Sequence, residues 1–81
     1  MKVPRSVSGS DLIRALKRMG YDVTRQSGSH VRLTLQQPQQ QHHITIPNHD
    51  PIKVGTLAAI LADVSTQLKI PRDELIRQMF G

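Results

Sequence analysis

Two short segments of the sequence, residues 31–35 and 43–46, alternate strictly between apolar and polar side chains. Strict alternation is typical of β-strands with one buried face and one face in water, because successive side chains point to opposite sides. Residues 21–24 alternate as well and predict another strand, followed by a glycine-containing turn over 26–29. The polar, glutamine-rich run 36–41 predicts a hairpin tip between the second and third strands, and we assign it no function.

The alternation also divides the strand side chains between two faces of the predicted sheet. We expect the apolar set to pack under helices: Val31, Leu33, Leu35, Ile44 and Ile46. The polar set then points to the open face: His30, Arg32, Thr34, His43 and Thr45.

Helical periodicity occurs on both sides of these strands. Ser8 with Asp11 predicts a capping box, apolar residues recur over 12–19, and Gly20 suits the left-handed position after the helix. A second helix is predicted from about Lys53, and Pro71 suits the first position of a short last helix. The fold class is therefore α+β, with the order helix, three antiparallel strands, helix and short helix, and with the helices on one face of the sheet.

The chain has 81 residues and a formal net charge of +5, which predicts a single domain, 1–81, with a polyanionic partner. Nucleic acid is the usual partner, although an acidic protein would also fit. The longest apolar run, 57–62, is far shorter than the roughly 20 residues that cross a membrane, so no membrane contact is expected. Without cysteines, disulfides and thiolate chemistry are excluded. Lys2, Pro4 and Arg5 interrupt any apolar leader, and we expect a cytoplasmic protein.

His30 is the main candidate for chemistry. It follows Gly28 and Ser29, whose turn N–H groups can meet a phosphate, and Arg25 and Arg32 flank the same turn. A neutral imidazole can accept the proton of a ribose 2′-hydroxyl as that oxygen attacks the adjacent phosphorus, and arginines stabilise the charge that develops. This route needs no metal. The alternative is a surface histidine without a task, and the pattern alone leaves both interpretations open.

Two other groups of residues are candidate sites. His42 and His43 are adjacent on a strand and point to opposite faces, so we expect solvated histidines and no metal site. His43 is a minor candidate for a second proton carrier, beside Ser29 or water. Lys53 stands at a helix start, where free N–H groups attract phosphate, although an ordinary helix start explains it as well.

The sequence resembles the HicA (YcfA-like) toxin family over residues 5–68, and a C-terminal extension, 70–80, follows. The motifs that carry the resemblance are Ser8-Gly9-Ser10-Asp11-Leu12-Ile13, Met19-Gly20-Tyr21, Arg25-Gln26-Ser27-Gly28-Ser29-His30, Ile44-Thr45-Ile46-Pro47-Asn48-His49, Lys53-Val54-Gly55-Thr56-Leu57 and Ile60-Leu61. The resemblance implies a double-stranded-RNA-binding-like fold and a metal-independent mRNA interferase whose catalytic histidine is His30. It also implies an antitoxin, HicB, that covers this histidine and can help to repress the operon.

The resulting hypothesis is an endoribonuclease toxin with no cofactor. Its catalytic residue is His30, and its expected RNA contacts are Gly28, Ser29, Arg25, Arg32 and Lys53. It is expected to be a monomer alone and a hetero-oligomer with the antitoxin. The alternatives are a non-catalytic RNA-binding module and a partner-binding protein whose nuclease activity has decayed. The loop 36–41 and the helix after Pro71 depart from the family pattern, away from Gly28–His30.

Overall fold

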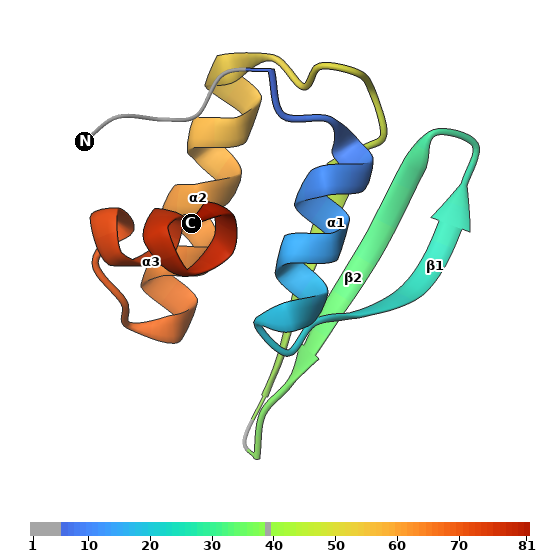
Figure 1. Ribbon diagram of the computed structural model, residues 1–81. Helices are drawn as coiled ribbons and strands as arrows, with labels where there is room; N and C mark the ends of the chain where they lie inside the picture. The colour runs from blue at the N-terminus through green and yellow to red at the C-terminus, as the bar shows by residue number, and fades with distance from the viewer. Residues whose placement is uncertain (1–5, 39) are drawn as a thin grey trace.

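A computed structural model of the chain describes residues 6–38 and 40–81 (Figure 1). Residues 1–5, including the predicted interruption of a leader, and Gln39 of the polar run lie outside the described residues. The elements follow the predicted order: α1 (Gly9–Arg18), β1 (Asp22–Ser27), β2 (His30–Gln36), β3 (Gln41–Pro47), α2 (Val54–Leu68) and α3 (Arg72–Phe80). The predicted α+β class is therefore confirmed.

The three strands form one antiparallel sheet in the order β1-β2-β3. The five apolar residues assigned to the helix-covered face are all buried, whereas His30, His43 and Thr45 on the opposite face are exposed. The expectation that Thr34 is solvent-exposed is wrong, because it is only 3% exposed. Its hydroxyl lies 2.8 Å from Thr24 Oγ1 and 2.9 Å from His43 Nδ1, and these neighbours cover it.

The core lies between the sheet and the helices and includes residues from all three helices. Leu75 and Met79 of α3 are fully buried in it, and Ile76 and Phe80 pack against its margin. Burying apolar side chains of this size contributes about 1.5–3 kcal/mol each. The C-terminal helix is thus packed on the same core as the rest of the fold.

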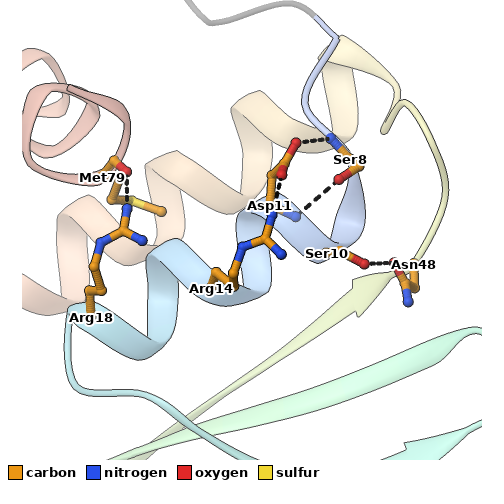
Figure 2. Close-up of polar contacts among 7 residues, drawn as sticks. All are labelled: Ser8, Ser10, Asp11, Arg14, Arg18, Asn48 and Met79. Atoms are coloured by element: carbon orange, nitrogen blue, oxygen red, sulfur yellow. Dashed lines mark hydrogen bonds and ion pairs between the residues drawn. The ribbon is translucent and has the colours of Figure 1, made fainter.

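Polar contacts around α1 fix where this helix begins and how it meets α3 (Figure 2). Ser8 Oγ accepts a hydrogen bond from the Asp11 N–H at 3.0 Å, and Asp11 Oδ2 accepts one from the Ser8 N–H at 3.3 Å. This is the predicted capping box. At the other end, Arg18 Nη2 donates to the Met79 carbonyl at 2.6 Å, which ties α1 to the last turn of α3. Gly20 then reverses the chain with a φ of 107°.

Candidate functional site

The β1–β2 hairpin ends in a turn of two residues, Gly28 and Ser29, closed by the pair Ser27 and His30. The predicted turn over 26–29 was too long, because β1 continues through Ser27. Gly28 has a φ of +57°, and Ser29 does not share that sign. Glycine at the first central position alone is the pattern of a type II′ turn, whose twist matches the flanking strands. Strand β2 therefore begins at His30, immediately after the turn.

His30 is the first residue of β2 and is exposed, as predicted. Its neighbour Val31 is buried under the helices, so the imidazole lies on the open face of the sheet. Ser27 of β1 and Pro47 of β3 stand opposite it. Among the described residues, no side chain forms a hydrogen bond with its ring. The imidazole is thus accessible to a ligand from solvent.

The turn before His30 is held in place by the loop that follows β3. The N–H of Asn48 donates to the Ser29 carbonyl at 2.6 Å. This loop is in turn fixed to the start of α1, where the Gly9 N–H donates to the His49 carbonyl at 2.8 Å. Figure 2 shows Ser10 and Asn48 at the same junction, with their side-chain oxygens 3.4 Å apart. The position of the site therefore depends on α1 as well as on the sheet.

Arg25 and Arg32, two of the expected RNA contacts, are brought together directly. They are partners in the β1–β2 register, two pairs along from Ser27 and His30. Arg25 is exposed and Arg32 is half-buried. In the described part of the chain, neither arginine has an ion pair with a carboxylate. The open face beside His30 therefore carries two uncompensated positive charges.

Lys53 lies at the same end of the sheet, but it comes from a different element. It is the residue that precedes α2, it is exposed, and no side chain caps this helix. Together with Pro47, His49 and Thr56 it lines a hollow at the start of α2. Since Pro47 stands opposite His30, this hollow begins one strand away from the candidate catalytic residue. The placement is compatible with a phosphate contact for Lys53.

His43 lies on the open face with His30, but far along it. It is paired with Thr34, four residues after His30 in β2, which corresponds to about 13 Å between the two positions. The hydrogen bond between its Nδ1 and Thr34 Oγ1 also holds its ring at that end. The two imidazoles cannot both reach one phosphodiester group. Ser29 and water remain the candidates for a second proton carrier.

His42 points to the helix-covered side of the sheet, opposite to His43, as predicted. The expectation that it is solvated is wrong, because its side chain is only 12% exposed. Its Nδ1 lies 2.6 Å from the Tyr21 hydroxyl, and its Nε2 lies 3.1 Å from Asp63 Oδ1 of α2. Burial, with a smaller effect of the Asp63 carboxylate, raises the pKa of Tyr21 to about 12. These contacts give His42 a structural role between the strand and the helix.

No group of three or more His, Asp or Glu side chains lies close enough together to hold a metal ion within residues 6–38 and 40–81. In the same ranges, no helix has both the length and the apolar character needed to cross a membrane.

Comparison with known proteins identifies the family. The sequence profile described as HicA toxin of bacterial toxin-antitoxin matches residues 9–65, from the start of α1 into α2. This is more than half of the chain, and the protein belongs to the HicA toxin family of bacterial toxin–antitoxin systems. No curated protein and no solved structure matches it significantly. The match ends before α3, so the family assignment rests on the helix, the sheet and most of α2.

Sequence reasoning missed one residue beside the candidate site. Ser27 was placed in the turn, whereas it stands directly opposite His30 on β1. Nothing in the polar run from Thr24 to Ser27 distinguishes strand from turn, because no apolar residue marks the alternation. Only the pairing with β2 reveals that its side chain shares a face with the histidine.

Proposed function

We propose that this HicA-family toxin is a metal-independent endoribonuclease that cuts mRNA, with His30 as its catalytic residue. In this reaction a ribose 2′-oxygen attacks the adjacent phosphorus, the bond from phosphorus to the 5′-oxygen breaks, and a 2′,3′-cyclic phosphate forms. The observation that carries the proposal is the exposed imidazole of His30, at the end of a two-residue turn and on the face that holds Arg32. It takes the proton of the 2′-hydroxyl or supplies one to the leaving 5′-oxygen.

The residues around His30 would hold the substrate through its phosphate groups. Arg25 and Arg32, two positions along the strands from His30, would supply positive charge close to the phosphorus where negative charge develops. The backbone N–H groups of Gly28 and Ser29 would contact a phosphate at the turn, and Lys53 would contact one on the β3 side. Because these are contacts to the backbone of the RNA, we expect little dependence on base sequence. Binding should weaken steeply as salt is added, since bound phosphates release counterions.

The family also supports a specific kind of partner. We propose that the toxin is a monomer alone, acts in the cytoplasm, and is neutralised by a HicB-like antitoxin in a hetero-oligomer. The site is an open sheet face with no enclosing walls, so a protein laid over β1 and β2 would exclude RNA from His30. The net charge of +5 favours an acidic surface on that partner.

The test compares the wild-type protein with His30→Ala, expressed in a bacterium without an antitoxin and also purified. We expect the variant to permit growth and to lose cleavage of RNA, while wild-type cleavage persists in the presence of a chelator. Because His30 is exposed and its side chain has no hydrogen bond in the described structure, the two proteins should melt at the same temperature. A variant that cuts RNA as fast as the parent removes His30 from the mechanism. RNA binding without cleavage in both proteins would instead indicate a non-catalytic module.

A further inference from the structure

The pairing of β1 with β2 is interrupted by one extra residue. The register passes from Val23 opposite Leu33 to Arg25 opposite Arg32, so Thr24 has no partner of its own. This is a β-bulge, which turns the following side chains to the other face of the sheet. Without it, alternation from Val23 would send Arg25 to the helix-covered side with Leu33. The bulge therefore places Arg25 on the open face.

The bulge has the same effect on the next alternate residue, Ser27. Four side chains consequently meet on the open face: Arg25 beside Arg32, and Ser27 beside His30. On the other side of β2, the partners of these two positions are Thr45 and Pro47, which are uncharged. Positive charge is thus concentrated between β1 and β2.

The opposition of Arg25 and Arg32 is unfavourable in the free protein. Directly opposed side chains on an antiparallel pair have Cβ atoms about 4.5–5.5 Å apart, and like charges at that position destabilise a sheet. The ion pairs of the described residues are elsewhere, at Arg14–Asp11, Arg77–Glu74 and His42–Asp63. Asp22, the acidic residue of β1, stands opposite Thr34, and the ion pairs of the described residues do not include it. An anion between the two guanidinium groups would remove the repulsion.

We propose that Arg25 and Arg32 form a clamp for a single RNA phosphate, the neighbour of the one that His30 acts on. The inference rests on the proposed function and adds the path of the substrate. Arg32 lies two residues from His30 on the same face, about 6.7 Å along β2, a distance comparable to one phosphate step of an extended strand. The RNA strand then runs along the groove between β1 and β2, and Ser27 flanks the phosphate that is cut.

The chemistry of the clamp fits RNA better than a structural role. Guanidinium groups bind phosphate oxygens through two parallel hydrogen bonds, and two such groups can share one phosphate. The chain has one tyrosine and one phenylalanine and no tryptophan, and Tyr21 is buried, so stacking on bases is scarcely available. Contacts to phosphate must therefore supply most of the affinity for the strand.

The test uses Arg25→Gln, Arg32→Gln and the double variant, each combined with His30→Ala so that the probe stays intact. The probe is a short fluorescein-labelled single-stranded RNA of mixed sequence, and its Kd is measured by anisotropy at two salt concentrations. The matched control is Arg72→Gln, which removes the same charge from the exposed start of α3. Each single variant should weaken binding by about tenfold. The double variant should weaken binding by much less than the product of the two single losses. The reason is that the same phosphate contact is lost in each single variant and in the double variant.

A second readout does not depend on RNA. Since each glutamine relieves the repulsion between the two guanidinium groups, Arg25→Gln and Arg32→Gln should melt at the same temperature as the parent or higher. The clamp is overturned if either variant binds RNA as well as Arg72→Gln does. It is also overturned if the loss of affinity in the double variant equals the product of the two single losses, as expected for arginines that bind separate phosphates. Unchanged RNA affinity with weakened binding of the co-expressed antitoxin assigns the pair to a protein partner instead. Loss of binding in the variants, with no cleavage by the wild-type protein, keeps the clamp and refutes the nuclease.

Discussion

Gly9 offers a sharp test of how the site is held, because it is the point where α1 touches the loop after β3. A Cβ atom added at Gly9 would lie 2.5 Å from Asn48 Cα and Oδ1 and 3.0 Å from the Pro47 carbonyl oxygen. Ordinary carbon contacts are about 3.5–4.0 Å, so the loop must move by about 1 Å. Two of the three nearest atoms belong to the backbone, and a side-chain rotation cannot relieve them. Gly9→Ala is therefore expected to be destabilising.

Two effects of opposite sign decide the size of this change. Alanine is favoured over glycine in a helix by about 0.5–1 kcal/mol. Overpacking against a fixed backbone costs about 1–3 kcal/mol. We expect this cost to exceed the helix preference, so that the free energy of unfolding falls by about 1 kcal/mol. For a domain of this size that corresponds to a Tm lower by roughly 4–8 °C. Because the displaced Asn48 also donates to the Ser29 carbonyl, RNA cleavage should fall together with stability.

The assay is thermal unfolding followed by circular dichroism, with Gly55→Ala as the matched control. Gly55 lies in the first turn of α2, and an added Cβ would meet nothing within 4 Å. The control should therefore raise Tm slightly, by the helix preference alone. If Gly9→Ala melts at or above the wild-type temperature, the close approach of α1 to the loop does not exist in solution. If it melts lower but cuts RNA at the parent rate, the loop does not position the turn.

Substitutions at His43, Tyr21 and Asp11 test three other parts of the structure. If His30 is the catalytic residue, His43→Ala should keep the rate of RNA cleavage within about twofold, because His43 lies about 13 Å along the sheet from His30. A loss as large as that of His30→Ala would contradict this geometry. Tyr21→Phe should lower the free energy of unfolding by about 1–2 kcal/mol, measured in urea, because it removes the buried hydroxyl that is bonded to His42. Hydrogen bonds from the Ser8 N–H and hydroxyl lower the pKa of Asp11, and the ion pair with Arg14 adds to this. A lowered folded-state pKa stabilises the protein above the unfolded-state value of 3.8, and this contribution is lost as pH falls through the folded-state value. Asp11→Asn should therefore melt below the wild-type protein at pH 7, and the difference in Tm should shrink in acid.

The faces of β2 and β3 could be predicted from the sequence because the apolar and polar residues alternate within each strand. In Val31–Leu35 and Ile44–Ile46 an apolar residue marks every position on the helix-covered face, so the side of His30 followed by simple alternation. The capping box at Ser8 was equally local, since both partners lie within one turn. Predictions of this kind succeed where the contacts that fix a residue are close to it in sequence.

The features that the sequence did not predict depend on contacts between distant segments. The burial of His42 depends on Tyr21, the residue before β1, and on Asp63 of α2, which only the folded chain brings together. The bulge at Thr24 lies in a strand whose six residues are all exposed, so no buried residue reports the change of face. The flanking positions of Arg25 and Arg32 were evident from the sequence. Their direct opposition depends on the unpaired residue Thr24, and the sequence around Thr24 has no hydrophobic pattern that would indicate a bulge.

The irregular features of the sheet are concentrated in one hairpin, and this distribution supports a functional site there. The β2–β3 pairing runs without interruption from His30–Pro47 to Gln36–Gln41. The β1–β2 pairing, in contrast, contains a bulge at Thr24 and two directly opposed arginines, Arg25 and Arg32. Each departs from the arrangement that best stabilises a sheet, and natural proteins retain such departures mainly where function requires them. Because β1 is an exposed edge strand, these departures leave the core between β2, β3 and the helices intact.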